Sequence, residues 1–179
     1  MVRASRLHRE DRGFESFTAH KMKIRHANLK DAPMLSKLMG LIINSTHYYS
    51  IEARKEETKK HDLKFLKQYL SDKKYYCCLV ATEEKEIIGF AIGRNEAGVF
   101  WADWLGVRKD KRRGGVAELL MKEWEKILKK KGVHKIWCDT RTSNKESVSL
   151  LLKLKYKKLG LFGNGWYKQD FFLWEKNLI

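Results

Sequence analysis

An apolar segment, a basic segment with two glycines and an amphipathic segment follow one another directly in the middle of the chain. GVFWADWLGV (98–107) has the composition of a buried strand, and RKDKRRGG (108–115) carries five basic side chains. From about Gly114 to Lys131, apolar residues recur at helical spacing. The chain must therefore form a strand, a tight loop and a helix in succession, and this unit restricts the fold to a mixed α/β class.

The loop of this unit is suited to an anion. The first N–H groups of a helix lack intrahelical partners and lie at the positive end of its dipole, so a pyrophosphate can accept several backbone hydrogen bonds there. Gly114 and Gly115 leave the backbone bare for such an approach. Arg112 and Arg113 add charge, and Ala117 keeps the next turn small. The segment is neither a Walker loop nor a GxGxxG motif, and a flexible helix entry or a nucleic-acid contact stays an open alternative.

The rest of the chain alternates between strand and helix patterns around that unit. The order predicts one mixed α/β domain over residues 22–179, with residues 1–21 as a flexible N-terminal extension. Ser143 and Glu146 form a Ser-x-x-Glu pattern that predicts the N-cap of the last helix. The expected strands are 22–28, 75–81, 86–93, 98–107, 134–140, 158–162 and 166–176, and the expected helices are 31–45, 52–70, 114–131 and 143–155.

Composition limits the compartment and the ligands. With 179 residues and 43% hydrophobic side chains, the chain can bury one core. No run approaches the roughly 18–20 apolar residues of a membrane span, and the N-terminus lacks the apolar stretch of a secretory signal. A cytoplasmic protein without a membrane partner is therefore expected. Cys77, Cys78 and Cys138 have neither disulfide nor metal-ligand spacing, so we expect small buried hydrophobes and no metal site.

The net charge of +16 at pH 7 indicates a preference for anionic partners. Nucleic acid, a polyanionic cofactor and the lysine-rich surface of a heat-adapted protein would each account for it. Stretches such as KLKYKKLGLF alternate basic and apolar or aromatic residues, which would suit base stacking beside phosphate contacts. No recognised nucleic-acid motif accompanies them, and charge alone does not decide between the three.

Two signatures resemble those of the GCN5-related N-acetyltransferase (GNAT) superfamily. The pattern V-x-x-x-x-R-x-x-G-x-A, met by Val107, Arg112, Gly115 and Ala117, is similar to its acetyl-CoA pyrophosphate motif. The segment TSNKESVSLLLKLKYKKLGL (142–161) resembles its second signature. The resemblance covers about residues 22–178. It implies a mixed, mostly antiparallel central sheet flanked by helices, in which a splayed pair of strands binds acetyl-CoA.

The resemblance also implies which residues hold the co-substrate acetyl-CoA. The backbone of Leu105 and Val107 would pair with the pantetheine amides, and Asn144 would lie near the thiol end. The N–H groups of the loop and the first helical turn would hold the pyrophosphate. The implied coenzyme-binding residues are Leu105, Val107, Arg112, Arg113, Gly114, Gly115, Val116, Ala117 and Asn144.

The reaction that the resemblance implies is direct attack of a primary amine on the acetyl thioester. An alkylamine with a pKa of about 10.4 must first lose a proton, so a base is needed. Asp139 and Asp103, on strands facing the expected site, are the candidates. Leu151 stands where many members of the family carry a tyrosine as general acid, and leucine cannot donate a proton. Tyr167 is the expected substitute.

The acceptor is expected to be a protein N-terminus, a lysine or a small-molecule amine. Its cleft is expected beside NSTHYYS (44–50) and FGNGWYKQD (162–170), lined by His47, Tyr48, Tyr49, Trp166 and Tyr167, with Glu52 as an anion. Two other functions stay open: a basic nucleic-acid-binding module, and an acetyl-CoA sensor of the same fold that transfers nothing. A homodimer is also left open.

Overall fold

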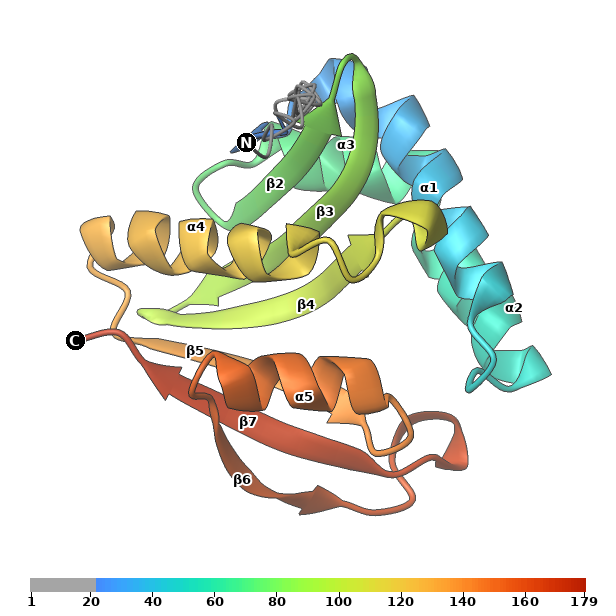
Figure 1. The fold of residues 1–179 in the computed structure, drawn as a ribbon, viewed down its shortest axis with the longest axis vertical. Coiled ribbons are helices and arrows are strands. Elements are labelled where there is room, and N and C mark those ends of the chain that lie inside the picture. The colour runs from blue at the N-terminus through green and yellow to red at the C-terminus, as the bar shows by residue number, and fades with distance from the viewer. Residues whose placement is uncertain (1–21) are drawn as a thin grey trace, which may run out of the picture.

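The computed structural model describes residues 22–179, which form one seven-stranded sheet with helices on both faces (Figure 1). The strand order is β1-β2-β3-β4-β5-β7-β6, and every neighbouring pair is antiparallel except β4 and β5. The mixed, mostly antiparallel sheet expected from the sequence is thus confirmed. The extension expected for residues 1–21 lies outside the described residues. The strands are β1 (Lys23–His26), β2 (Tyr76–Glu83), β3 (Glu86–Glu96), β4 (Val99–Val107), β5 (Lys135–Arg141), β6 (Lys157–Phe162) and β7 (Phe171–Asn177); the α-helices are α1 (Ala32–Ser45), α2 (Ile51–Lys60), α3 (Leu63–Ser71), α4 (Val116–Lys130) and α5 (Lys145–Lys153); the 3-10 turns are η1 (Leu29–Asp31), η2 (Lys109–Lys111) and η3 (Trp166–Lys168).

Two apolar clusters cover opposite faces of the sheet. Helices α1 and α3 pack on one face, and α4 and α5 pack on the other (Figure 1). Along β2, Cys77 and Leu79 belong to the α4 side, whereas Cys78 and Val80 belong to the α1 side. Because β2 is buried on both faces, it reads as a continuous apolar run. The cysteines are free and buried, as expected. Among residues 22–179, no helix has both the length and the apolar character needed to cross a membrane.

Strands β4 and β5 are paired at one end only. They run parallel from the Val99–Lys135 pair to the Ala102–Cys138 pair, and α4 supplies the crossover that parallel neighbours require. Beyond these pairs, β4 stays bonded to β3 as far as Val107, while β5 stays bonded to β7 as far as residue 141. The two strands therefore part, as expected of the splayed pair. We call the space between residues 103–107 and 139–141 the fork.

One segment that the sequence predicted as a single helix forms two helices. The segment 52–70 divides into α2 and α3 because Asp62 is an N-cap in its middle: its Oδ1 accepts a hydrogen bond of 2.8 Å from the N–H of Phe65. A carboxylate that satisfies a free N–H group in this way favours a new helix start over continuation. The break gives α2 its own direction. The inner side of α2 faces the fork rather than the apolar cluster under α1 and α3.

Two further boundaries also differ from the prediction. The N-cap of α5 is Asn144 and not Ser143, since Asn144 Oδ1 accepts a hydrogen bond of 3.2 Å from the N–H of Ser147. The last strand begins at Phe171 and not at residue 166, because the 3-10 turn η3 occupies residues 166–168. This turn projects from the β6–β7 connection and brings residues of that connection to the cavity described below.

The approach of β3 to β4 depends on a glycine, and we expect its replacement to be costly. At Gly93, a Cβ would lie 2.5 Å from two ring carbons of Phe100 and from the carbonyl oxygen of Trp101. Gly93→Ala is therefore expected to lower the free energy of unfolding by about 2–3 kcal/mol through overpacking. Gly40→Ala is the control: it lies within α1 with nothing within 4 Å of its Cβ, and should stabilise by about 0.5–1 kcal/mol. Urea denaturation measures both, and an equally stable Gly93→Ala variant would contradict the close approach.

Candidate functional site

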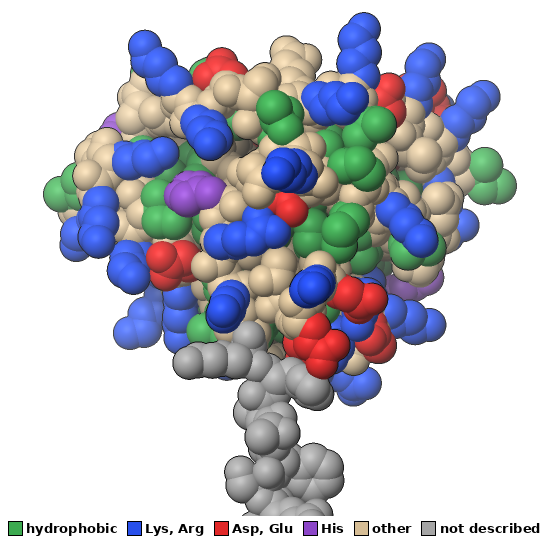
Figure 2. All heavy atoms as spheres, turned by 90° about the horizontal axis from the view of Figure 1, so that it is seen from above, with side chains coloured by type: hydrophobic (Ala, Val, Ile, Leu, Met, Phe, Trp, Pro, Cys, Tyr) green, Lys and Arg blue, Asp and Glu red, His purple; other side chains and the backbone are tan. Residues whose placement is uncertain are grey.

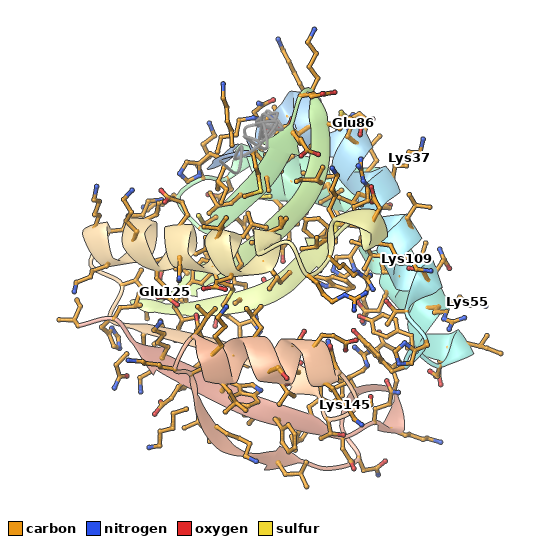
Figure 3. All side chains as sticks on the ribbon, in the orientation of Figure 1. Lys37, Lys55, Glu86, Lys109, Glu125 and Lys145 are labelled. Carbon is orange, nitrogen blue, oxygen red and sulfur yellow. The ribbon has the colours of Figure 1, made fainter. Side chains whose placement is uncertain are left out.

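A cavity of about 490 Å³ opens at the fork. Its walls come from β4 and β5, from α1, α2 and α5, and from the β6–β7 connection, so segments far apart in the sequence meet there. Both polar and aromatic side chains line it. Lys109 of η2 and Lys145 of α5 lie on the two sides of the wide end of the fork (Figure 3). Within the cavity itself, Lys60 and Arg141 are the lysine and the arginine among the lining residues.

The basic loop ends in backbone that no side chain caps. Gly115 is the N-cap of α4 with φ +79°, it forms no side-chain cap, and nothing lies within 4 Å of where its Cβ would be. Arg113 is also left-handed, with φ +62°. A glycine is needed at position 115, because a side chain there would be strained and would project into the open space in front of the helix. The first N–H groups of α4 are thus presented to that space.

Ion pairs hold the loop against the sheet. The Arg108 guanidinium donates hydrogen bonds to Asp110 and to Glu86, with the Nη1–Oε2 distance to Glu86 at 2.5 Å, and Lys111 pairs with Glu83. Glu83 belongs to β2 and Glu86 to β3, so Lys111 and Arg108 face those strands. Within residues 22–179, Arg112 and Arg113 form no ion pair with the sheet, and Arg112 Nε donates instead to the carbonyl oxygen of Val107 at 3.2 Å. The guanidinium groups of the motif therefore stay at the loop's outer surface.

The β4 edge of the fork has free backbone groups. The N–H of Arg108 donates to Ile88 of β3 at 2.9 Å. Because donors alternate along a strand, the N–H groups of Leu105 and Val107 point away from β3 and into the fork. This is the edge that the sequence assigned to pantetheine. Asn144 lines the same cavity from the start of α5, where its Oδ1 is used by the helix cap.

The two candidate bases lie side by side where the strands part. Ala102 and Cys138 are the last parallel pair, so Asp103 and Asp139 are the first residues on the two arms, and both line the cavity. Asp103 is the additional residue of a β-bulge, since Ile92 is opposite Trp104 whereas the next residue of β3 is opposite Ala102. Bulges commonly redirect a side chain beside an active site.

These two carboxylates differ in their partners. Burial raises the pKa of each to about 6. Asp103 Oδ1 accepts a hydrogen bond from Arg94 of β3, while its Oδ2 is buried without a hydrogen-bond partner. The charge of Arg141 opposes the rise in the pKa of Asp139, and the charge of Glu57 adds to that rise. Asp139 is therefore the carboxylate without a dedicated cation partner of its own.

Tyr167 lies on the opposite wall and is already hydrogen bonded. Its hydroxyl donates to Glu57 Oε1 at 2.7 Å and accepts from Lys60 Nζ at 3.1 Å. Burial, followed by the bond to Glu57, raises its pKa. Leu151 is buried beneath the cavity and Tyr156 is buried in the core on the α4 side, so Tyr156 packs, as its position in the sequence suggested.

One wall of the cavity is formed by the α1–α2 joint, α2 and η3, where the sequence placed the acceptor cleft; we call it the acceptor wall. It contains part of what the sequence indicated. Tyr48, Tyr49 and Trp166 line the cavity as expected. The prediction that His47 and Glu52 line the cleft is wrong, because both are exposed and neither is among the lining residues. They lie on the outer side of the α1–α2 joint and of the first turn of α2. The acid that α2 does bring to the wall is Glu57, with two neighbours, Lys60 and His61.

Arg141 is a second residue that the sequence did not single out for the acceptor wall. Its guanidinium carbon lies 3.9 Å from the ring centroid of Tyr49 and 5.0 Å from that of Phe171, and its Nε donates to Gln169 at 2.7 Å. Gln169 Nε2 in turn donates to the carbonyl oxygen of Tyr48 at 2.8 Å. Arg141 thereby joins β5 to the α1–α2 joint and the β6–β7 connection. A planar cation fits such a stacked position better than lysine would.

The residues present fit coenzyme A. An open strand edge, uncapped helix N–H groups and the basic loop with Arg112 and Arg113 meet the needs of its amides and its pyrophosphate. Within residues 22–179, His, Cys, Asp and Glu form no cluster of three or more that could hold a metal ion. A sheet forked between parallel strands, with a basic glycine loop at the helix that follows, is typical of acyltransferases that use acyl-coenzyme A.

Comparison with known proteins identifies the family. Residues 43–156 match the model of the acetyltransferase (GNAT) family, and since this is more than half of the chain, the protein belongs to that family. Comparison of the sequence with curated proteins gives no significant match.

Solved structures with the same fold include several N-acetyltransferases. The PaiA N-acetyltransferase from Thermoplasma acidophilum, in complex with coenzyme A, has a TM-score of 0.76 at 20% identity over 88% of this chain and 99% of that one. The ribosomal-protein-S18-alanine N-acetyltransferase from Escherichia coli has a TM-score of 0.69 at 17% identity, over 88% and 94%. Ard1 from Thermoplasma volcanium has a TM-score of 0.68 at 16% identity, over 88% and 98%. At such identities the likeness concerns the fold.

Proposed function

We propose that the protein is an N-acetyltransferase that moves an acetyl group from acetyl-CoA to a primary amine. The observation that carries this proposal is the fork, because the parting of β4 from β5 opens a cavity lined by Leu105 and Asp139, and β4 continues into the loop that ends at the uncapped start of α4. An anion-binding loop at the end of β4 and an acidic, aromatic cavity beside the same strand suit a transfer from an anionic nucleotide to an amine.

The geometry of the loop supports the coenzyme-binding residues that the resemblance implied. The N–H groups from Arg113 to Ala117, including those of Gly114, Gly115 and Val116, would hold the pyrophosphate, with Arg112 and Arg113 supplying charge. Leu105 and Val107 would bind the pantetheine through their backbone, and Asn144 would lie near the thiol end. When bound, acetyl-CoA supplies an acetyl thioester whose carbonyl carbon receives the amine nitrogen as its C–S bond breaks.

Asp139 would take the proton of the incoming amine. At neutral pH, a carboxyl group with a pKa of about 6 is mostly ionised and able to accept a proton. It lies at the start of the fork, and Arg141 stabilises its charge. Asp103 is the less suitable base, because its hydrogen bond from Arg94 favours the unprotonated form that must be given up on proton transfer.

Tyr167 would donate a proton on the leaving side only after release from Glu57. Its hydroxyl proton lies in the hydrogen bond to Glu57 Oε1. Lys60, whose Nζ donates to the hydroxyl oxygen of Tyr167, stabilises the ionised form of the tyrosine. Leu151 offers no alternative donor, and water reaching the open end of the fork can protonate a thiolate without help from a side chain.

The nucleic-acid alternative has less support. On the face drawn in Figure 2, lysine and arginine side chains are spread over the whole surface and are interspersed with acidic ones, rather than gathered in one stripe. Many lysines are also paired with glutamates, as Lys122 and Lys153 are with Glu118. A polymer-binding surface favours a contiguous basic track. The alternative of an acetyl-CoA sensor is distinguished by activity, since a sensor would bind the coenzyme and transfer nothing.

Calorimetric titration of the purified protein tests the proposal. We expect saturable binding of acetyl-CoA at one site, and weak, salt-sensitive binding of ATP and of a short RNA in parallel titrations. Mass spectrometry of an amine incubated with protein and acetyl-CoA then separates enzyme from sensor. Tight RNA binding without acetyl-CoA binding would overturn the proposal in favour of the nucleic-acid alternative.

A further inference from the structure

Glu57 is a partly buried carboxylate on the acceptor wall that the proposed reaction does not yet use. It lies one turn after Ala53, the buried residue of α2, and one turn before His61. Its side chain is only 14% exposed. A charged side chain on a solvated helix is rarely held so far from water unless partners compensate it. What Glu57 contacts therefore bears on what the cavity binds.

The contacts of Glu57 leave part of its carboxylate free. Oε1 accepts the 2.7 Å hydrogen bond from Tyr167. Oε2 is 3.4 Å from His61 Nδ1, but that nitrogen lies closer, at 2.8 Å, to the backbone carbonyl oxygen of Glu57. Burial lowers the pKa of His61, so the ring is neutral at neutral pH. An ionised carboxylate has about four acceptor positions. Glu57 can thus accept hydrogen bonds from a ligand without losing Tyr167.

The charges around Glu57 favour a cation. Three carboxylates line the cavity: Glu57, Asp103 and Asp139. The cations among the lining residues are Lys60, whose Nζ donates to Tyr167, and Arg141, which is stacked on Tyr49 and bonded to Gln169. From β3, Arg94 pairs with Asp103. Lys60 donates to Tyr167 and Arg141 donates to Gln169 rather than to Glu57, so Oε2 can accept a hydrogen bond from a ligand.

The walls around these acids are aromatic. Trp104 lies 4.9 Å from the His61 ring and 6.5 Å from the Tyr49 ring, measured between centroids. Tyr48 and Trp166 line the same cavity. Aromatic faces attract ammonium groups and stabilise the methylene groups next to them, but they offer nothing to a carboxylate. The wall therefore suits an alkylammonium ion and is unfavourable for an anion.

We propose that Glu57 binds the ammonium group of the acceptor before Asp139 takes its proton, and that the acceptor is an alkylamine with no carboxylate within about four carbons of its amine. This inference rests on the proposed function. Glu57 and Asp139 are close enough for the charge of one to affect the other, so one ammonium group can be attracted by both. Free amino acids would place their own carboxylate against three others and would be rejected by like-charge repulsion.

The test compares n-butylamine with 4-aminobutyrate, which has the same chain length and a terminal carboxylate. We expect the wild-type protein to acetylate n-butylamine with a kcat/KM at least 100-fold higher. Glu57→Gln keeps the acceptor oxygen for Tyr167 and removes the charge. It should raise the KM for n-butylamine about tenfold, equivalent to about 1.4 kcal/mol, change kcat less than threefold and reduce the preference over 4-aminobutyrate. Glu56→Gln removes a neighbouring acid that is not among the lining residues and should leave both constants unchanged.

Each remaining outcome decides the inference. Equal use of the two amines by the wild-type protein, or an unchanged KM in Glu57→Gln, would overturn it while leaving the proposed function intact. The wild-type comparison needs no variant, so a Glu57→Gln protein that fails to fold does not remove the test. If a peptide with a free N-terminus is the only amine acetylated, its KM is compared in the same two variants. Absence of acetylation of all three amines would overturn the proposed function itself.

Discussion

Asp139→Asn is expected to lower kcat by about 100- to 10,000-fold, the contribution usual for a positioned general base. Asparagine keeps the shape of the side chain but cannot accept the amine proton. The coenzyme loop lies at the far end of the fork from position 139, so the affinity for acetyl-CoA should change little. Initial rates over a range of amine concentrations, with calorimetry for acetyl-CoA, measure both quantities.

The pH dependence should identify the same group. Burial raises the pKa of Asp139 from its ordinary 3.8 to about 6. If its ionised form is the base, kcat/KM should fall about tenfold per pH unit below pH 6 and be flat just above it. The Asp139→Asn variant should lack this acid limb. A limb that persists unchanged in the variant would assign the titration to another group.

Stability should change in the opposite direction to activity. A carboxyl group whose pKa is higher in the folded state stabilises the protein most at low pH, and this contribution is lost as the pH rises from about 4 to about 6. For a rise from 3.8 to about 6, the loss is about 3 kcal/mol at neutral pH. Asp139→Asn removes the buried charge, so above pH 6 it should unfold at higher urea concentration than the wild type. Lower activity with higher stability is the combination expected of a residue kept for function.

Asp103→Asn is the matched comparison. Asp103 has the same raised pKa and lies opposite Asp139 across the fork, but Arg94 donates to it. We expect a loss of kcat below tenfold, because the base would remain. If the large loss and the loss of the acid limb follow Asp103→Asn instead, Asp103 is the base, and the proposed role of Asp139 is wrong.

The sequence predicted the loop for a local physical reason, whereas the fork was implied by the resemblance to the GNAT superfamily. The glycines, the arginines and the amphipathic helix are neighbours in the chain, and their spacing favours bare backbone at the positive end of a helix. The period of each strand likewise indicated the mixed sheet. Alternation cannot reveal a bulge, however, because the additional residue appears only when β4 is set against β3. The sequence therefore placed Asp103 on the right strand without indicating its pairing with Arg94.

The acceptor wall was harder to predict because it depends on tertiary contacts. Glu57 lies in a charged segment, EARKEETKK, whose acids look alike in the sequence. Which acid faces the cavity depends on the end of α2 before Asp62 and on the turn η3, which brings Tyr167 to Glu57. The sequence selected Glu52, five residues earlier and on another side of the helix. The one usable signal was the Asp62 cap, since a helix start there would have separated α2 from α3.

Gly115→Asp is expected to weaken coenzyme A binding on the order of 100-fold. A carboxylate at the N-cap of α4 would accept hydrogen bonds from the N–H groups that the pyrophosphate needs, and it would repel the negative charge of the pyrophosphate. Loss of two charge-assisted hydrogen bonds at about 1.5 kcal/mol each corresponds to on the order of 100-fold in Kd. Calorimetry with coenzyme A measures the change. The fold should survive, because nothing lies within 4 Å of the new Cβ.

The same helix provides the control at its other end. Gly132 follows α4 with φ +75°, and nothing lies within 4 Å of its Cβ. Gly132→Asp therefore imposes the same left-handed strain, of about 1–2 kcal/mol, far from the fork. We expect it to lower stability at least as much as Gly115→Asp, since an aspartate is unfavourable at the negative end of the helix dipole, and to bind coenzyme A as the wild type does. Equal loss of binding in both variants would mean that the glycine serves the stability of α4. Loss in Gly115→Asp alone would mean that the bare start of the helix is kept for a phosphate group.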